Sequence, residues 1–145
     1  MTEEGHAACI LAIVGSRDVH REGGLRAINE AIERHKPLVI VSGGAKVNMS
    51  NRLRKLISID EEAERIGHEL GLQVVSFRPT TYQFNAPGGF KERNIKIADL
   101  CHCLVRIASS TTTTYGSGWT ADYAASIGKN VERFVVDEKG VITNG

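Results

Sequence analysis

The chain contains 145 residues, of which 41% are hydrophobic and 24% charged, and its formal net charge at pH 7 is +1. This length predicts one domain, residues 1–145, with a core of its own. The near-neutral charge argues against a general affinity for nucleic acid. No apolar run approaches the roughly 18 residues that a membrane-spanning helix needs, and the acidic start MTEEGHAAC is unlike a signal peptide. We therefore expect a cytoplasmic protein without a membrane partner.

Metal binding is not expected, although the sequence contains one suggestive pattern. Cys101, His102 and Cys103 are consecutive, and Cys9 is the third cysteine. Alternate residues of a strand face opposite sides, and the sequence has no second CxxC or HxxxH pair to complete a tetrahedral site. We expect reduced thiols, no metal and no other cofactor.

The first predicted strand covers residues 8–14, because ACILAIV is a continuous apolar run of the kind that is buried on both faces in parallel sheets. Gly15 allows a tight exit from this strand, and Ser16 offers a hydroxyl and an N–H group just past its carboxyl end. Ligands bind at such ends in open α/β sheets. Arg17 then has two interpretations, a phosphate contact or a surface ion pair with Asp18.

A helix and a second buried strand follow. Apolar residues at helical spacing predict a helix over residues 24–36, which Pro37 ends. Residues 38–41 are again continuously apolar and form the second predicted strand. A glycine-rich segment follows this strand as well, so a second loop is expected at the same kind of position. It consists of Ser42, Gly43 and Gly44.

Residues 46–58 carry several basic side chains and no acidic one. Three interpretations stay open: a lid over an anionic ligand, a nucleic-acid contact, or a solvent-exposed helical excursion whose apolar residues pack locally. The next helix is predicted to begin at Asp60, which we expect to cap it, and to end at Gly71.

The second half of the chain continues the alternation of strands and helices. Strands are predicted over residues 72–77, 101–107 and 131–136, and residues 141–143 are a candidate edge strand. A helix over residues 89–100 presents Arg93 and Asn94 one turn before its apolar residues. Tyr82 and Phe84 lie in the long loop before this helix, where aromatic residues stack on a base, form the hinge of a lid or anchor the loop.

The most distinctive stretch is YGSGWTADY, residues 115–123, which follows a strand and the hydroxyl-rich segment SSTTTT. Glycines expose backbone N–H groups and a helix N-terminus adds a partial positive charge, so a strand, a glycine loop and a helix together form a phosphate cradle. A plain turn into a buried helix is the alternative. The candidate ligand- or phosphate-binding residues of the chain are Gly15, Ser16, Arg17, Ser42, Gly43, Gly44, Asn94, Gly116, Ser117, Gly118, Trp119 and Thr120.

The alternation of strands and helices predicts the fold. Right-handed crossovers place helices on both faces of a parallel sheet. We therefore expect an α/β protein, a three-layer Rossmann-like domain with a mostly parallel sheet of five strands. The loops that contain Gly15, Gly43 and Gly116 then converge on the carboxyl edge of the sheet.

Five motifs are spread over nearly the whole chain. They are IVGSRD at 13–18, VSGGA at 41–45, Ile59-Asp60 with a helix that ends in Gly71, ERNIKIAD at 92–99, and GSGWTADYAASIGKNV at 116–131. Together they resemble the SLOG superfamily of Rossmann-like proteins, which includes the LOG phosphoribohydrolases, the lysine decarboxylase-like proteins and the DNA-processing protein A domain. The similarity is greatest to the small YspA/YpsA-related branch.

The resemblance implies a chemistry and candidate catalytic residues. In LOG enzymes, an arginine before the fourth strand and a glutamate after a PGGxGT loop cleave the N-glycosidic bond of a nucleoside 5′-monophosphate. Arg93 matches the arginine, and Asp122 falls at the place of the glutamate. A carboxylate near the sugar suits an oxocarbenium-like transition state. This chain departs from the LOG pattern at the loop, where TYG replaces PGG and Trp119 replaces the threonine.

The sequence thus predicts binding of a nucleotide or nucleotide-derived ligand through glycine-rich loops at the carboxyl edge of a parallel sheet. The alternative is a LOG-like hydrolase, a phosphoribohydrolase that acts on nucleoside 5′-monophosphates. The second alternative is a nucleic-acid-associated protein, which only the basic segment 46–58 supports. The resemblance also implies a homodimer or a higher homo-oligomer.

Overall fold

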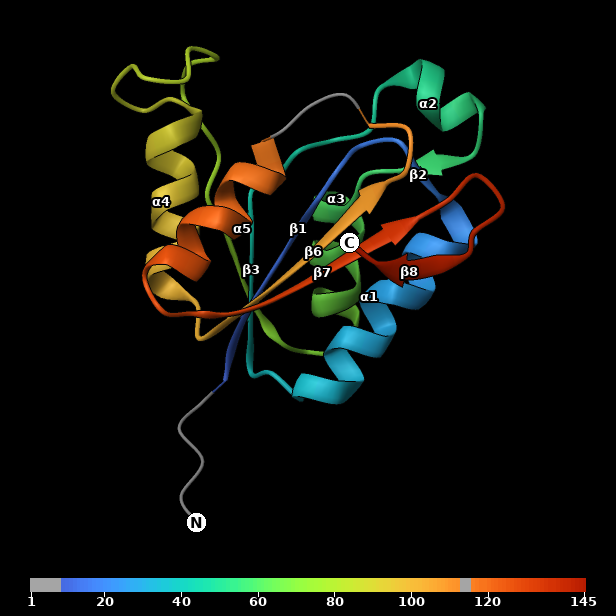
Figure 1. The fold of residues 1–145 in the computed structure, drawn as a ribbon, viewed down its shortest axis with the longest axis horizontal. Coiled ribbons are helices and arrows are strands. Elements are labelled where there is room, and N and C mark those ends of the chain that lie inside the picture. The colour runs from blue at the N-terminus through green and yellow to red at the C-terminus, as the bar shows by residue number, and fades with distance from the viewer. Residues whose placement is uncertain (1–8, 113–115) are drawn as a thin grey trace.

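The computed structural model describes residues 9–112 and 116–145. Within these ranges the chain folds into a central sheet with helices on both faces (Figure 1). Of the predicted segments, Ala8 of the first strand, residues 113–114 of the hydroxyl-rich segment and Tyr115 of the glycine-rich stretch lie outside the described residues. No helix in the described ranges is both long enough and apolar enough to cross a membrane.

The central sheet has six strands in the order β5-β3-β1-β6-β7-β8. They are β1 (Ile10–Gly15), β3 (Val39–Ser42), β5 (Gln73–Ser76), β6 (Cys103–Ser109), β7 (Asn130–Val136) and β8 (Ile142–Asn144). The first five of these run parallel, and β8 pairs antiparallel with β7 at one edge. The mostly parallel sheet is confirmed. It has one strand more than the predicted five, because the candidate edge strand belongs to it.

The strand order has a reversal at the centre of the sheet. Numbered along the chain, the five parallel strands lie in the order 3-2-1-4-5, which is compatible with a Rossmann-like fold. The winding reverses between β1 and β6. Ligands of such sheets bind outside the carboxyl ends of the strands at this reversal.

Two helices cover each face of the sheet (Figure 1). They are α1 (Arg21–His35) and α3 (Ile59–Glu69) on one face, and α4 (Phe90–Leu100) and α5 (Gly116–Ser126) on the other. Successive side chains of a strand face opposite sides. On β1, Leu11 and Ile13 therefore join the core beneath α1 and α3, whereas Ala12 and Val14 join the core beneath α4 and α5. Burial on both faces accounts for the continuous apolar run of this strand.

Three helices begin earlier than the sequence predicted, and α1 begins at Arg21 and not at residue 24. The cap of α3 is Ser58, whose Oγ accepts from the N–H of Glu61 at 3.3 Å, so Asp60 lies inside the first turn and is not the cap. Helix α5 begins at Gly116, so the glycines expected to form a loop belong to its first turn. The helix itself offers no carbonyl partner to the first four N–H groups of that turn.

Residues 46–58 form an excursion at the carboxyl edge of the sheet. It contains helix α2 (Met49–Leu53) and strand β4 (Leu56–Ile57), which pairs antiparallel with β2 (Val19–His20). The Ser58 hydroxyl donates to the carbonyl of Ala45 at 2.6 Å, and Asn51 Nδ2 donates to the carbonyl of Arg17 at 3.1 Å. These bonds fix the excursion beside the end of β1.

Candidate functional site

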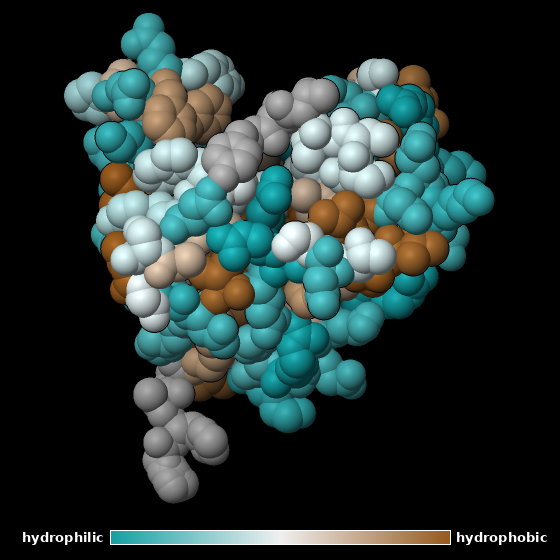
Figure 2. Space-filling view, in the orientation of Figure 1, coloured by the Kyte–Doolittle hydropathy of each residue, from teal (hydrophilic) through white to brown (hydrophobic). Residues whose placement is uncertain are grey.

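The carboxyl ends of β1, β3 and β6 lie at one edge of the sheet, toward the top and right of Figure 1. Gly15 ends β1, Gly43 follows β3, and Gly116 begins the helix after β6, so the three glycine segments share this edge as predicted. Figure 2 shows a notch in the molecular surface between the loop before α4 and the excursion that contains α2. The candidate functional site lies at this edge.

Gly15 and Ser16 join the ends of β1 and β6. The Ser16 hydroxyl accepts from the N–H of Ser109 at 2.8 Å, and the Ser16 N–H donates to the carbonyl of Ile107 at 3.2 Å. A Cβ at Gly15 would stand 2.0 Å from the same Ile107 oxygen, so only glycine fits there. Both residues therefore hold the ends of β1 and β6 together. The buried Ser16 hydroxyl has its hydrogen-bond partner within the protein.

Asp60 is a buried carboxyl group at this edge, with only 5% of the residue exposed. Its Oδ2 accepts from the N–H of Ala45 at 3.1 Å, whereas Oδ1 has no hydrogen-bond partner among the described residues. Burial raises the pKa of Asp60 to about 6, although the N–H groups of Ala45 and Gly15 and the charge of Arg93 oppose this shift. A buried acid with such a raised pKa at the carboxyl edge of a sheet is a candidate functional group.

Arg93 reaches the same place from α4, on the other face of the sheet. Its Nη1 donates to the carbonyl of Gly43 at 2.6 Å, and its Nε donates to Oδ1 of Asn94 at 2.7 Å. The guanidinium carbon lies 5.3 Å from the centroid of the Phe90 ring. Burial lowers the pKa of Arg93 and the charge of Asp60 raises it. Arginine nevertheless stays a cation in proteins.

Gly43 separates these two charged groups. A Cβ on Gly43 would stand 2.5 Å from Arg93 Nη1 and 3.0 Å from Asp60 Oδ2. A side chain at this position would therefore displace the end of the Arg93 side chain from its contact with the backbone. We call Gly43, Asp60, Arg93 and Asn94 the Asp60–Arg93 cluster.

A second acid, Glu64, lies on α3 one turn after Asp60. It accepts a hydrogen bond from the buried Ser42 hydroxyl, and its Oε1 lies 3.4 Å from Arg78 Nη2. The N–H of Gly44 donates to Ser42 Oγ at 3.1 Å. Ser42 and Gly44, predicted as ligand-binding residues, therefore attach the second glycine loop to α3, and the charge of Glu64 contributes to the raised pKa of Asp60.

The first turn of α5 contains the predicted phosphate cradle. Gly116 is exposed, Gly118 is buried, and the Ser117 hydroxyl accepts from Arg106 Nε at 2.9 Å. The buried Thr120 hydroxyl donates to the carbonyl of Gly116 at 3.0 Å. Arg106 of β6 thus brings a cation to a helix N-terminus that already favours anions.

Asp122, the predicted catalytic carboxylate, takes part in an ion pair with β7. Its Oδ1 accepts from Arg133 Nη2 at 2.9 Å, and 53% of its side chain is exposed. Among the described contacts, Asp60 is the carboxyl group beside Arg93. Asp60 is therefore the acid whose charge is coupled to that of Arg93, whereas Asp122 is paired with Arg133.

Aromatic side chains attach the loop before α4 to α5. The Trp119 ring stacks on Tyr123 with 5.4 Å between centroids and meets the edge of Phe84 at 5.5 Å. These contacts favour the anchoring interpretation of Phe84. Tyr82 is 88% exposed, although its ring lies 6.0 Å from Phe90.

The predicted cations outside the cluster are at the surface. Arg17 is exposed, and so are the basic residues of the excursion. These are Lys46, Arg52, Arg54 and Lys55. Arg52 lies 3.9 Å from Glu61. The excursion therefore adds positive charge beside the site without joining the buried cluster.

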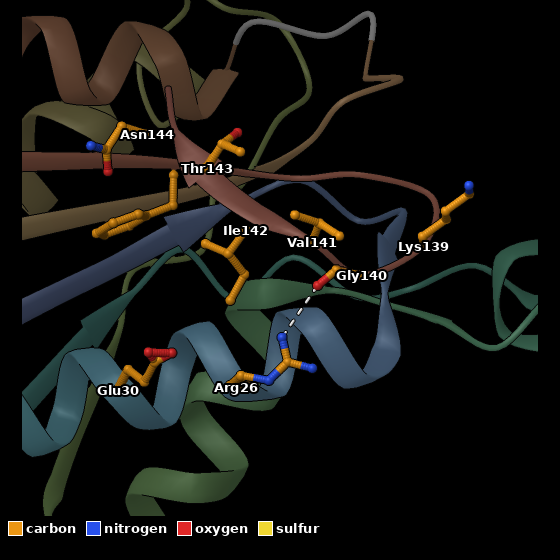
Figure 3. Close-up of a pocket in the computed structure, with 9 residues that line it drawn as sticks. Arg26, Glu30, Lys139, Gly140, Val141, Ile142, Thr143 and Asn144 are labelled. Atoms are coloured by element: carbon orange, nitrogen blue, oxygen red, sulfur yellow. Dashed lines mark hydrogen bonds between the residues drawn. The ribbon is translucent and has the colours of Figure 1, made fainter.

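A separate hollow lies between α1 and the β7–β8 hairpin (Figure 3). Arg26 of α1 donates from Nη1 to the carbonyl of Gly140 at 3.3 Å across it. Its lining includes Glu30, Phe134 and Ile142, and none of the predicted site residues. We place the candidate site at the carboxyl edge because the buried Asp60 and the half-buried Arg93 and Glu64 gather there.

The described ranges contain no group of three or more His, Cys, Asp or Glu side chains that could hold a metal ion. Cys9, Cys101 and Cys103 are free thiols near the amino ends of β1 and β6. Burial raises the pKa of Cys101 to about 11 and also raises that of Cys9. Cys9 and Cys101 are therefore protonated at neutral pH, and all three thiols lie at the opposite edge from the Asp60–Arg93 cluster.

No protein-family model, curated protein or solved structure matches the chain. The functional interpretation therefore depends on the geometry described above and on the motifs in the sequence.

Two charged residues of this edge, Asp60 and Arg106, were not among the residues that the sequence predicted for the site. The segment from Ser58 to Glu61 has the S-x-x-E pattern of a capping box. That pattern would have assigned the cap to Ser58 and left Asp60 available for another role. Arg106 has no comparable signal, because it is a single charge within an apolar strand.

Proposed function

We propose that this chain binds a nucleotide or a nucleotide-derived small molecule at the carboxyl edge of its sheet, as a Rossmann-like domain of the SLOG type. The strand order supports the proposal, since sheets of this order bind nucleotides where the winding reverses. The five sequence motifs support it independently of the geometry. The proposal keeps the phosphate cradle at α5 and assigns the acid of the site to Asp60.

The observation that carries the proposal is the burial of Asp60 beside Arg93. A buried carboxyl group with one unpaired oxygen destabilises a fold by about 1–3 kcal/mol. A position without a function would be filled more favourably by an apolar residue. Charged groups that stay in a crevice despite this cost are typical of binding and catalytic sites.

The carboxyl edge offers different chemistry to different parts of a nucleotide. The N-terminus of α5, with Arg106 bound to Ser117, favours an anion such as phosphate. Asp60 offers a hydrogen-bond acceptor and Arg93 a second cation. A ligand that combines a phosphate with neutral polar groups matches both parts of this edge.

A second candidate function, hydrolysis of the N-glycosidic bond of nucleoside 5′-monophosphates, is favoured by the pKa of Asp60. Burial raises this pKa to about 6, so the carboxyl group exchanges its proton near neutral pH. An ionised carboxylate stabilises an oxocarbenium-like sugar, and a protonated one donates to the leaving base. Water would add at C1′ and release the free base and ribose 5-phosphate, with Asp60 in the role first given to Asp122.

A thermal-stability screen against nucleoside mono- and diphosphates, ADP-ribose and cyclic nucleotides tests the proposal. A ligand at a hundred times its Kd adds about 2.7 kcal/mol of stability, which raises Tm on the order of 10 °C. We expect a much smaller rise for Asp60→Asn and an unchanged rise for Asp99→Asn, a matched replacement at the exposed end of α4. The proposal fails if no compound raises Tm, or if Asp60→Asn responds like the wild type.

Release of free base from a panel of nucleoside 5′-monophosphates tests the second candidate. Turnover should fall by orders of magnitude in Asp60→Asn and persist in Asp122→Asn. Clear binding without release from any member of the panel would reject the hydrolase and leave the binding function standing.

The assembly and nucleic-acid predictions have separate tests. We propose a homodimer or higher homo-oligomer on the basis of the resemblance, and light scattering measures its mass against the 15.8 kDa of one chain. Nucleic-acid association is supported only by the exposed cations of residues 46–58. Titration with DNA and RNA at low and physiological salt tests that alternative.

A further inference from the structure

Cys9 and Cys103 bring two thiols together at the amino edge of the sheet. Cys103 is the first residue of β6, and Cys9 directly precedes β1, the strand beside it. Both residues are half-buried, whereas Cys101 is buried. The thiols of Cys9 and Cys103 are therefore the ones that a small reagent in solution reaches most easily.

The backbone holds these two residues close together. In the parallel ladder between β1 and β6, Cys103 pairs with Leu11. Cys9 comes two residues before Leu11, and residues two apart in an extended chain face the same side. The N–H of His102 donates to the carbonyl of Ile10 at 2.9 Å, and the N–H of Ile10 donates to Nδ1 of His102 at 3.1 Å. The start of β1 is thus bonded to the residue before Cys103, and Cys9 is the diagonal neighbour of Cys103 across the two strands.

The two side chains also interact directly. Burial raises the pKa of the Cys9 thiol, and the charge of Cys103 and a hydrogen bond with the Cys103 thiol raise it further. A hydrogen bond between two thiols requires that their sulfur atoms are neighbours. Nδ2 of Asn130 donates to the Cys103 sulfur as well, at 3.8 Å. Two neighbouring, half-buried thiols are the arrangement from which a disulfide forms.

We propose that Cys9 and Cys103 are a redox-active pair, which a small disulfide such as oxidised glutathione converts reversibly into an intramolecular disulfide. This inference does not depend on the proposed function, because the pair lies at the opposite edge of the sheet from the candidate site. Disulfides that form in a reducing cytosol are usually transient and redox-sensing, so the inference is compatible with the expected localisation.

The exchange conserves atoms and electrons in two steps. The thiolate, and not the thiol, attacks a disulfide. Because burial and Cys103 keep Cys9 protonated, the Cys103 thiolate attacks one sulfur of oxidised glutathione and releases the first glutathione. Cys9 then loses its proton, attacks the Cys103 sulfur of the mixed disulfide and releases the second glutathione. The protein dithiol gives up two electrons and two protons, and the glutathione disulfide becomes two glutathione thiols.

The spacing of the strands predicts that this disulfide is readily reduced. One strand across and two residues along correspond to about 8 Å between Cα atoms, whereas the Cα atoms of a disulfide lie about 4.4–6.8 Å apart. The backbone at Cys9 therefore moves toward β6 when the bond forms. Cys9 lies outside β1, but its carbonyl accepts from the N–H of Leu38 at 3.0 Å, which resists the movement. Strain makes a disulfide easier to reduce, and labile disulfides are typical of redox regulation.

Peptide mapping of the full chain tests this inference. The protein is equilibrated at about pH 8 with glutathione buffers of increasing oxidised fraction, then quenched with acid, alkylated, digested and analysed by mass spectrometry. The wild type should give one intramolecular disulfide, between Cys9 and Cys103, with the Cys101 thiol free. Dithiothreitol should remove this disulfide. Cys101→Ser is the matched control and should give the same product, whereas Cys9→Ser should give a mixed disulfide of glutathione with Cys103.

Three results would overturn the inference. The first is a wild type without an intramolecular disulfide even in fully oxidised glutathione, with its thiols free or joined only to glutathione. The second is a disulfide that includes Cys101, and the third is one that joins two chains. In each of these cases the neighbouring positions of Cys9 and Cys103 would not determine the pairing. The peptide map of the wild type decides the question even if a serine variant fails to fold.

Discussion

Asp60 and Arg93 meet at Gly43, although they come from helices on opposite faces of the sheet. Arg93 Nη1 stands 2.5 Å, and Asp60 Oδ2 3.0 Å, from the position that a Cβ on Gly43 would occupy. The end of β3 is therefore the place where an acid and a cation are brought within reach of one ligand. Neither helix alone offers both groups.

Gly43→Ala should abolish ligand binding, because the added methyl group would displace the Arg93 guanidinium or the Asp60 carboxylate. Overpacking of this kind costs about 1–3 kcal/mol of stability. Urea denaturation measures that cost, and titration with the best compound of the screen measures binding. A variant that binds like the wild type would show that the close approach has no role in the site.

Gly71→Ala is the matched control for this replacement. Gly71 follows α3 at its other end, has a φ of +74°, and has no atom within 4 Å of an added Cβ. Alanine there should cost about 1 kcal/mol through backbone strain alone. Ligand affinity should stay unchanged.

Asp60 should make stability depend on pH in an identifiable way. Burial raises its pKa from 3.8 to about 6, so the folded protein binds this proton more tightly than the unfolded chain does. The stability that Asp60 contributes is therefore present below about pH 4 and lost as the pH rises through about 6, a loss of about 3 kcal/mol. Urea denaturation from pH 4 to 8 measures this as the difference between wild type and Asp60→Asn. A difference that does not change with pH would contradict the buried state of Asp60.

Asp122→Ala should have little effect. Half-exposed ion pairs such as that between Asp122 and Arg133 contribute about 0–1 kcal/mol. We expect a small loss of stability and an unchanged Kd. A large loss of affinity would indicate that Asp122 contributes to ligand binding, and it would weaken the assignment of Asp60 as the acid of the site.

Lys36→Gly should stabilise the protein by about 0.5–1 kcal/mol. Lys36 caps the C-terminus of α1 with a φ of 48°, in the left-handed region that glycine adopts without strain. Lys36→Ala provides the control, since alanine keeps the strain. Equal stabilities of the glycine and alanine variants in urea denaturation would contradict this account.

Most of the fold could be predicted from apolar runs. Strands such as β1 and β6 are buried on both faces, so their sequences carry a strong signal. The pairing of β2 with β4 could not be predicted, because two-residue strands have no periodicity. The start of α5 was predicted too late because Gly116 and Gly118 have low helix propensity. The first turn of the helix nevertheless contains both glycines.

The site was predicted less completely than the fold. The glycine segments and Arg93 follow from motifs and strand ends, which the sequence displays. The direction of a helical side chain depends on the residue at which the helix begins, and that residue was wrong for both α3 and α5. The cap was therefore assigned to Asp60 and not to Ser58. Asp122 came from the resemblance, and its catalytic role stays a prediction.

Backbone amide NMR with the tightest compound of the screen tests the central claim most directly, since it locates the ligand without any variant. The account predicts the largest shift changes at Gly15, Gly43, Asp60 and Gly116, at the carboxyl ends of the strands. Shift changes confined to the hollow of Figure 3, at Arg26, Gly140 and Ile142, would contradict it.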